Sequence, residues 1–178
     1  MMITIDRRPR LATPRLTLRA PEPADAPRIA ALASDYGVAS MTTSIPYPLT
    51  VDQAADFLAR MDARDTAREA IFTIETEADG LIGMIGLHPS DAPAPELGYW
   101  LGRPYWGQGY ATEAAEAAIN WAGGDWGKGY VLAGHFADNP ASGRVLDKAG
   151  FLYTGEVQQR WSIARDAEAT TRMMVWLA

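Results

Sequence analysis

The alternation of apolar and polar positions along the chain predicts a series of β-strands. Residues 15–19, Arg-Leu-Thr-Leu-Arg, alternate strictly and predict a first strand. Two apolar runs at residues 71–76 and 81–87 flank an Ala-Asp-Gly turn at 78–80, which is typical of a β-hairpin. Further strands are predicted at residues 96–101, 130–136, 151–159 and 171–177.

Helical patterns occupy the intervals between these strands. They cover residues 23 to about 34, 50 to about 67, 111 to about 122 and 139 to about 149. Thr50-Val51-Asp52-Gln53 has the form of a capping box and predicts the start of the second helix. Residues 36–50, rich in Ser, Thr and Pro, are expected to be irregular. The order β-α-α-β-β-β-α-β-α-β-β indicates a mixed α/β fold with helices covering a central sheet.

Composition restricts the class of protein. The 178 residues predict one domain, 1–178, and no apolar run approaches the roughly 20 residues that cross a bilayer, so a cytoplasmic protein without membrane contact is expected. The formal charge of −6 argues against general nucleic-acid binding and weakly favours a cationic substrate. Without cysteine there is no cysteinyl acyl-enzyme, Cys-ligated zinc or disulfide, and two histidines make a multi-histidine metal centre unfavourable. We therefore predict no metal.

A glycine-rich turn lies between the strand at 96–101 and the alanine-rich helix. A Gly-x-Gly turn at a helix N-terminus leaves backbone N–H groups unpaired, and the helix dipole adds to them, so the turn is suited to bind phosphate. No lysine follows as in a P-loop, and Thr112 replaces the third small residue of a dinucleotide fingerprint. The turn consists of Trp106, Gly107, Gln108, Gly109, Tyr110, Ala111 and Thr112.

Two blocks of sequence together resemble the GNAT superfamily of acyl-CoA-dependent N-acetyltransferases. The first is the 96–101 strand followed by Tyr-Trp-Gly-Gln-Gly-Tyr-Ala-Thr-Glu-Ala at 105–114, and the second is Asn-Pro-Ala-Ser-Gly-Arg-Val-Leu-Asp-Lys-Ala-Gly-Phe at 139–151. The similarity is closest to the branch of ribosomal-protein N-terminal alanine and serine acetyltransferases. It implies the acyl-CoA N-acyltransferase fold, with a mostly antiparallel sheet of about six to seven strands and about four helices. Pro104 departs from the Gln or Arg of the general pattern, and Leu146 from its frequent tyrosine.

The resemblance implies acetyl-CoA as cosubstrate, with its pyrophosphate on the backbone amides of the turn. Backbone N–H groups near Tyr99 would polarise the thioester carbonyl. Asn139 would bond the pantetheine arm, act as a helix N-cap before Pro140, or do both. Arg144 and Lys148, at i and i+4, would meet nucleotide phosphates or form a solvated basic face. The implied cofactor residues are Tyr99, Trp100, Leu101, Trp106, Gly107, Gln108, Gly109, Tyr110, Ala111, Thr112, Asn139, Arg144 and Lys148.

The acceptor must attack as a neutral amine. Deprotonation near pH 7.4 costs about 4 kcal/mol for a lysine ε-amine and under about 1 kcal/mol for an α-amine, so one carboxylate acting through water suffices for the latter. Glu96 is the first candidate for the base; alternatively, it is only an exposed carboxylate at the end of a strand. Glu156 is the second candidate and His135 the third. The ribosomal-protein branch has a serine where Ser142 stands, so Ser142 is the candidate acid, unless its hydroxyl only bonds locally.

These observations predict direct transfer of acetyl from acetyl-CoA to a primary amine in a ternary complex. The acceptor would be a protein or peptide N-terminus or a small amine, and the protein a monomer or homodimer. The irregular 36–50 segment and the loop near Trp161 would form the acceptor cleft, with Tyr47 and Trp161 as possible contacts. The alternatives are a catalytically silent acyl-CoA-binding regulatory domain and an enzyme that modifies small molecules such as antibiotics.

Overall fold

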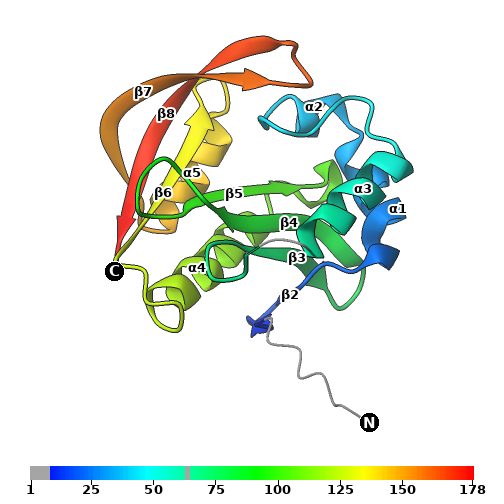
Figure 1. Cartoon of the computed structure of the whole chain (residues 1–178), viewed down its shortest axis with the longest axis horizontal. Coiled ribbons are helices and arrows are strands. Elements are labelled where there is room, and N and C mark those ends of the chain that lie inside the picture. Colours follow the sequence, from blue (N-terminus) through cyan, green and yellow to red (C-terminus); the bar gives the residue numbers. More distant parts are fainter. Residues whose placement is uncertain (1–8, 63–64) are drawn as a thin grey trace.

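A computed structural model describes residues 9–62 and 65–178, and within them a single twisted sheet of eight strands runs through the molecule (Figure 1). The strand order is β1-β2-β3-β4-β5-β6-β8-β7, and neighbours are antiparallel except for β5 and β6. The strands are β1 Leu11–Ala12, β2 Thr17–Arg19, β3 Ala70–Thr76, β4 Gly80–His88, β5 Glu96–Leu101, β6 Tyr130–Phe136, β7 Leu152–Ser162 and β8 Ala167–Leu177.

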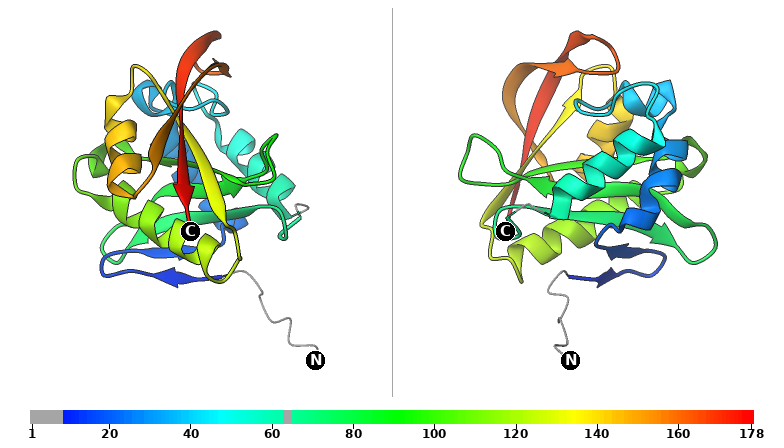
Figure 2. Two further views of the ribbon diagram at one scale, coloured as in Figure 1. Left: turned by 90° about the vertical axis from the view of Figure 1, so that its left-hand side faces the viewer. Right: turned by 45° about the vertical axis from the view of Figure 1, so that its right-hand side comes forward.

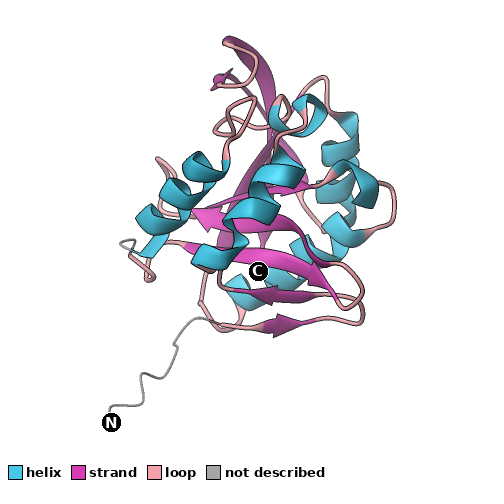
Figure 3. Ribbon diagram, turned by 90° about the vertical axis from the view of Figure 1, so that its right-hand side faces the viewer, coloured by secondary structure: helices cyan, strands magenta, loops and turns pink. Residues whose placement is uncertain are grey.

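Helices cover both faces of this sheet. The first pair, α1 and α3, packs on one face, and the second pair, α4 and α5, packs on the other (Figure 2). Figure 3 is drawn from the side of α1 and α3, with the strands behind them. The helical segments are η1 Pro23–Asp25, α1 Ala26–Ala33, α2 Tyr36–Ala39, α3 Val51–Asp62, η2 Arg103–Tyr105, α4 Tyr110–Gly123 and α5 Pro140–Lys148.

The two faces carry different hydrophobic cores. The larger core joins the sheet to α4, whose Ala114, Ala115 and Ala118 are fully buried and let the helix axis approach the strands closely. The smaller core lies under α1 and α3, where Ile29 and Leu58 pack on β4. Alternation along each strand assigns its side chains to one core or the other. Among the described residues no helix is long and apolar enough to cross a membrane.

The predicted mixed α/β fold with a mostly antiparallel sheet is confirmed, with local differences. The sheet has eight strands rather than six to seven, because the two-residue β1 is too short to show alternation. The predicted irregular segment contains α2, whose start is capped by Asp35, a side chain that accepts bonds from the Gly37 and Val38 N–H groups. The capping box is present: the Thr50 N–H donates to Gln53 Oε1 (2.9 Å) and the Gln53 N–H to Thr50 Oγ1 (3.2 Å).

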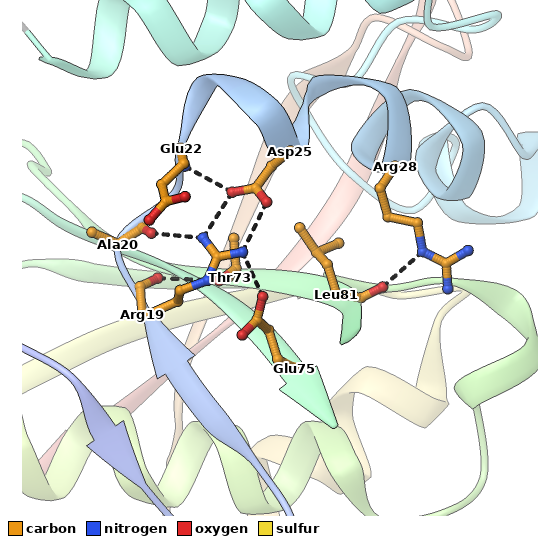
Figure 4. A network of polar contacts seen from close by, with 8 residues as sticks. All are labelled: Arg19, Ala20, Glu22, Asp25, Arg28, Thr73, Glu75 and Leu81. Carbon is orange, nitrogen blue, oxygen red and sulfur yellow. Dashed lines mark hydrogen bonds and ion pairs between the residues drawn. The ribbon is translucent and has the colours of Figure 1, made fainter. Parts of the chain in front are cut away.

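A partly buried ionic network fastens the start of η1 and α1 to the sheet (Figure 4). Arg19 on β2 donates two bonds to Asp25, of 2.8 and 2.9 Å, and a third to Glu75 on β3. Burial by itself would raise the pKa of Asp25, but the bonds from Arg19 and from the Glu22 N–H outweigh burial and hold it below its ordinary value. The network fixes the α1 face of the sheet on the side away from β6.

Parallel pairing of β5 with β6 opens the centre of the sheet. The two strands pair only at Glu96–Leu132 and Leu97–Ala133, and beyond these residues they diverge. The long β7–β8 hairpin extends past the same region, and Figure 1 shows its tip beside α2. There Ser162 Oγ donates to the Thr42 carbonyl at 2.9 Å and the Ile163 N–H to the Thr43 carbonyl at 3.1 Å. These bonds close the structure over the gap between β5 and β6.

Candidate active site

A cavity of about 1290 Å³ follows the gap between β5 and β6 and continues to α3 and to the β7–β8 hairpin. Among the residues predicted from sequence, Gln108, Glu156, Tyr47 and Trp161 do not line it. The predicted residues that do line it are Glu96, Tyr99, Trp100, Leu101, Trp106, Gly107, Gly109, Tyr110, Ala111, Thr112, His135, Asn139, Ser142, Arg144 and Lys148.

The glycine turn at one end of the cavity has the geometry of an anion site. Gly107 and Gly109 adopt φ of +73° and +82°, a region that only glycine enters without strain. Gly109 is the N-cap of α4, so the N–H groups of the first helical turn have no intrahelical acceptor and point along the helix axis. The side chain of Gln108 faces away, donating to the Pro104 carbonyl at 2.9 Å. The positive end of α4 therefore faces the cavity.

Two arginines hold this turn in place. Arg15 donates to the Gln108 carbonyl (2.9 Å) and pairs with Glu113 of α4 (2.7 Å). On the other side Arg103 forms two bonds with Asp35, of 2.8 and 2.7 Å, which lower the pKa of Asp35 to about 2. Sequence reasoning missed both, because the partners lie 98 and 68 positions away and no local pattern connects them.

The basic side of the cavity belongs to α5. Asn139 is its N-cap and accepts a bond from the Ser142 N–H at 3.3 Å, so the capping role is present. Arg144 and Lys148 project from the next two turns, are exposed, and form no ion pair with another described residue. Two unpaired cations and the helix start of α4 thus border one end of the cavity.

The backbone of β5 presents hydrogen-bonding groups to the gap. The Gly102 N–H donates to the Ile82 carbonyl at 2.9 Å, and bonding pairs alternate along an antiparallel ladder. The even-numbered residues of β5 therefore bond to β4, and the odd-numbered residues turn their N–H and C=O groups toward β6. Since β6 pairs with β5 only as far as Leu97, the N–H of Tyr99 faces the gap rather than a partner strand.

The side chain of Tyr99 crosses the cavity to α5. Its hydroxyl lies 2.7 Å from Ser142 Oγ and 3.3 Å from the Ser142 carbonyl. Burial raises the pKa of Tyr99 to about 12, against the opposing effect of the Ser142 hydroxyl, so the phenol keeps its proton at neutral pH. The structure thus joins the predicted acid Ser142 to a second hydroxyl that sequence reasoning had considered only for its backbone.

Glu96 lies on the opposite face of β5, the face toward α1 and α3. Arg160 from β7 contacts both of its carboxylate oxygens, one of them through Nη2 at 3.0 Å. The bond to Glu96 raises the pKa of Arg160, although burial of the guanidinium opposes it. About a fifth of each side chain, 24% for Arg160 and 22% for Glu96, is exposed. The pair is a fixed and partly desolvated feature of this face.

The other two predicted bases are less suitably placed. Glu156 is exposed on β7, outside the cavity, and accepts a bond from Gln158. His135 is buried, and both ring nitrogens are used: Nδ1 faces the Phe136 carbonyl at 2.8 Å, so it carries the proton, and Nε2 accepts from the Tyr153 hydroxyl at 2.8 Å. Neither group offers a lone pair to a ligand in the cavity.

Sequence reasoning missed His88, which lines the same cavity at the end of β4. Its Nδ1 lies 2.6 Å from Oε1 of Glu69, a carboxylate whose side chain is only 9% exposed. His88 is paired in register with Glu96 across β4 and β5. One signal in the sequence could have found it, since His88 is one of only two histidines in the chain and ends a strand that precedes the glycine turn.

Comparison with known proteins identifies the family. Residues 15–152 match the family described as an acetyltransferase (GNAT) domain, so the chain belongs to the GNAT acetyltransferases. The match covers both sequence blocks and the whole cavity except the contribution of the β7–β8 hairpin. The chain is an acetyl-CoA-dependent acetyltransferase of this family.

Individual relatives extend the match over most of the chain. The uncharacterized N-acetyltransferase p20 of Bacillus licheniformis is 30% identical over 149 residues, covering 82% of this chain and 83% of p20. The ribosomal-protein-S5-alanine acetyltransferase of Vibrio fischeri has the same fold, with a TM-score of 0.81, 18% identity and coverage of 95% of this chain and 96% of that one. A spermidine N-acetyltransferase from Vibrio cholerae, solved with CoA and spermine, matches with a TM-score of 0.75, 21% identity and coverage of 93% and 96%.

Proposed function

We propose that the protein transfers an acetyl group from acetyl-CoA to the primary amine of a protein or peptide N-terminus or of a small molecule, by direct attack within a ternary complex in the cytoplasm. The observation that carries the proposal is the gap between β5 and β6, which has an anion site at one end and a carboxylate-lined face at the other. Both substrates can therefore reach one point, the unpaired N–H of Tyr99.

The residues around the gap fit acetyl-CoA. The glycine turn and the first turn of α4 offer backbone N–H groups to a pyrophosphate, and Arg144 and Lys148 offer charge to further phosphates. A narrow arm reaching between the strands would meet the free backbone groups of β5 and the side chain of Asn139. When bound, acetyl-CoA supplies a thioester carbonyl that a backbone N–H can polarise. The family's cosubstrate and this chain's own groups therefore agree.

The amine enters from the other face. That part of the cavity is lined by side chains of α3, of the segment after α2, and of β7, and Glu96 and Arg160 form its polar floor. Because both oxygens of Glu96 contact Arg160, its carboxylate is fixed in orientation, and its remaining lone pairs can accept hydrogen bonds from the amine. Around it the wall is apolar, formed by Met41, Ile45, Leu49 and Phe57.

Binding and turnover test the proposal separately. Calorimetry with coenzyme A tests the anion site in the Gly107→Ala variant. The matched control is Gly127→Ala. Gly127 has a φ of +67° and Gly107 a φ of +73°, and at either position an added Cβ would have no heavy atom within 4 Å. Both variants carry the same backbone strain, but only Gly107 lines the cavity, so only Gly107→Ala should weaken binding, by about tenfold or more if one phosphate contact of about 1.5 kcal/mol is lost.

Release of free thiol from acetyl-CoA is then followed with a panel of amines: peptides with free N-termini, spermidine and simple alkylamines. The proposal expects turnover with at least one of them. Coenzyme A binding with no turnover on any amine would instead identify a catalytically silent acyl-CoA-binding domain. Equal loss of coenzyme A affinity in the Gly107 and Gly127 variants would remove the assignment of the turn.

A further inference from the structure

The amine side of β4 and β5 contains an imidazole that no motif of the sequence marks. His88 ends β4 and faces the cavity on the same side of the sheet as Glu96. Its ring lies flat over the strand: a Cβ placed on Gly86 would be 2.5 Å from Nε2, and one on Gly98 would be 4.0 Å from it. Two glycines on adjacent strands thus form an open floor beneath the ring.

The carboxylate behind this ring fixes its tautomer. Glu69 is 9% exposed and lies 2.6 Å from Nδ1, so in the neutral imidazole Nδ1 carries the proton and donates it to the carboxylate. The lone pair is then on Nε2, which no described residue hydrogen-bonds. An imidazole that lines a cavity, is backed by a carboxylate and has no described hydrogen-bond partner on its second nitrogen has the arrangement of a general base with its orienting group.

The position of Nε2 relative to β5 supports this role. Gly98 directly precedes Tyr99, whose N–H faces the gap where a thioester carbonyl would be polarised. An amine over the Gly98 floor is therefore close to that carbonyl and within reach of Nε2, directly or through one water. In the exposed part of the cavity the His88 side chain is 41% accessible, which allows a captured proton to pass to solvent.

We propose, on the basis of the acetyl transfer proposed above, that His88 is the group that accepts the proton of the acceptor amine, that Glu69 positions it, and that the Glu96–Arg160 pair orients the amine. The nitrogen attacks the acyl carbon, a C–N bond forms, and the C–S bond breaks with its electron pair going to sulfur. The nitrogen's proton goes to Nε2 of His88 and from there to water. The thiolate takes a proton from the Tyr99–Ser142 hydroxyls, which regain it from solvent.

This assignment differs from the sequence prediction that Glu96 is the base, and pH profiles distinguish the two. Imidazoles as a class titrate near pH 6.5 and carboxylates near pH 4. With an imidazole base, the amine and the base must each lose a proton, so log kcat/KM rises with a slope approaching 2 below about pH 6. A carboxylate base gives a slope of 1 in that range, from the amine alone. Among the described residues, Glu69 before β3 contacts the imidazole, and the charged groups that line the same part of the cavity are Glu96 on β5, Arg160 on β7, and Asp56 and Arg60 on α3.

The decisive activity measurement compares kcat/KM against pH for the wild type, His88→Gln and Glu96→Gln, with an amine that the wild type acetylates. His88→Gln should lower kcat/KM by about 100-fold and reduce the slope from 2 to 1. Glu96→Gln should raise KM for the amine and keep the slope of 2. A slope of 1 in the wild type overturns the proposal and restores Glu96 as base. Retention of slope 2 by His88→Gln also overturns it, because the second proton must then be lost from a group other than His88. A wild type without turnover on any amine overturns the proposed function itself.

Positioning is tested with variants that keep the histidine. Gly86→Ala places a methyl group 2.5 Å from Nε2, which displaces the ring, and should reproduce the lost slope, while Glu69→Gln should cause a smaller loss of kcat/KM. Glu77→Gln, an exposed turn carboxylate outside the cavity, is the matched control and should behave as wild type. Glu69→Gln with unchanged kinetics at every pH would remove Glu69 from the mechanism.

A spectroscopic measurement needs no substrate. Because the chain has only two histidines, the imidazole ¹⁵N spectrum contains two sets of signals, and His88→Gln assigns them. The wild type should show His88 as the Nδ1–H tautomer, and Glu69→Gln should shift its signals while leaving those of His135, bonded to the Phe136 carbonyl, in place. An Nε2–H tautomer at His88 in the wild type would contradict the proposal whatever the activity.

Discussion

The hydroxyl pair of Tyr99 and Ser142 gives a prediction whose magnitude separates a chemical from a structural role. Tyr99→Phe removes both contacts of the hydroxyl, at 2.7 Å with Ser142 Oγ and at 3.3 Å with the Ser142 carbonyl, whereas Ser142→Ala removes only the shorter one. Either change should lower the free energy of unfolding by about 1 kcal/mol. The pKa of Tyr99, about 12, means that ionising it costs about 3 kcal/mol more than for a free phenol, so the phenol keeps its proton and is unsuited to act as a base.

As a donor to the departing thiolate, the pair should matter far more for kcat than for stability. Each single variant should lower kcat by about 100-fold, equivalent to about 2.7 kcal/mol in the barrier. The double variant should be no slower than the singles, since both hydroxyls act as one unit. Stopped-flow detection of thiol release measures kcat, and urea unfolding measures stability.

A matched control exists in Tyr153→Phe, which removes a tyrosine hydrogen bond of 2.8 Å, to His135, from a side chain outside the cavity. It should cost a similar stability and leave kcat unchanged. If Tyr99→Phe behaves like Tyr153→Phe, with a loss of stability and a normal kcat, the donor role is refuted and the pair only anchors α5 to β5.

Two further predictions concern charge. Replacing Arg144 or Lys148 by Gln should raise KM for acetyl-CoA about two- to fivefold each, leave kcat unchanged, and weaken the dependence of KM on salt. Steady-state kinetics at two ionic strengths test this prediction. An unchanged KM would show that the two side chains form only a solvated basic face. Asp25→Asn should destabilise the fold by about 2 kcal/mol at pH 7, because it removes the carboxylate that Arg19 binds. The pKa of Asp25 is lower in the folded state than in the unfolded state. Its contribution to stability is therefore fully present above the unfolded pKa, near pH 4, and is lost as the pH falls through the folded pKa. Urea unfolding should show that the difference in free energy of unfolding between wild type and variant shrinks as the pH falls below about 4. A difference that does not shrink as the pH falls below about 4 would contradict this explanation.

The parts of the fold that were predictable from sequence are those with local causes. Apolar runs found β3, β4 and β5, and one capping box and one glycine turn located the starts of α3 and α4. The end of α3 was less predictable: the helical pattern continues to about residue 67, but the described helix ends at Asp62 and residues 66–68 form a turn. The short elements β1 and α2 have too few residues for any periodicity to appear.

For the candidate site, the sequence could specify the glycine turn but not the side-chain partners of the candidate catalytic groups. The glycines at positions 107 and 109 indicate a backbone with positive φ, which the structure has at both residues. The pairing of Glu96 with Arg160, by contrast, joins positions 64 apart through the order β6-β8-β7 in the sheet, and the pairing of His88 with Glu69 depends on the β3–β4 register. Such contacts decide whether a carboxylate is free to act as a base or is held in an ion pair. The spacing of residues along the sequence does not predict them.

The division of the sheet into two faces has a consequence for how such a protein changes over generations. In the proposed reaction the cofactor contacts α4 and α5, whereas the amine side is lined by α3, the segment after α2, and the β7–β8 hairpin. Substitutions in the second group can therefore redesign the acceptor pocket while acetyl-CoA continues to bind as before. Mutational tolerance should accordingly be concentrated at residues 41–60 and at the hairpin tip, and a selection for new amines would be expected to accumulate its changes there.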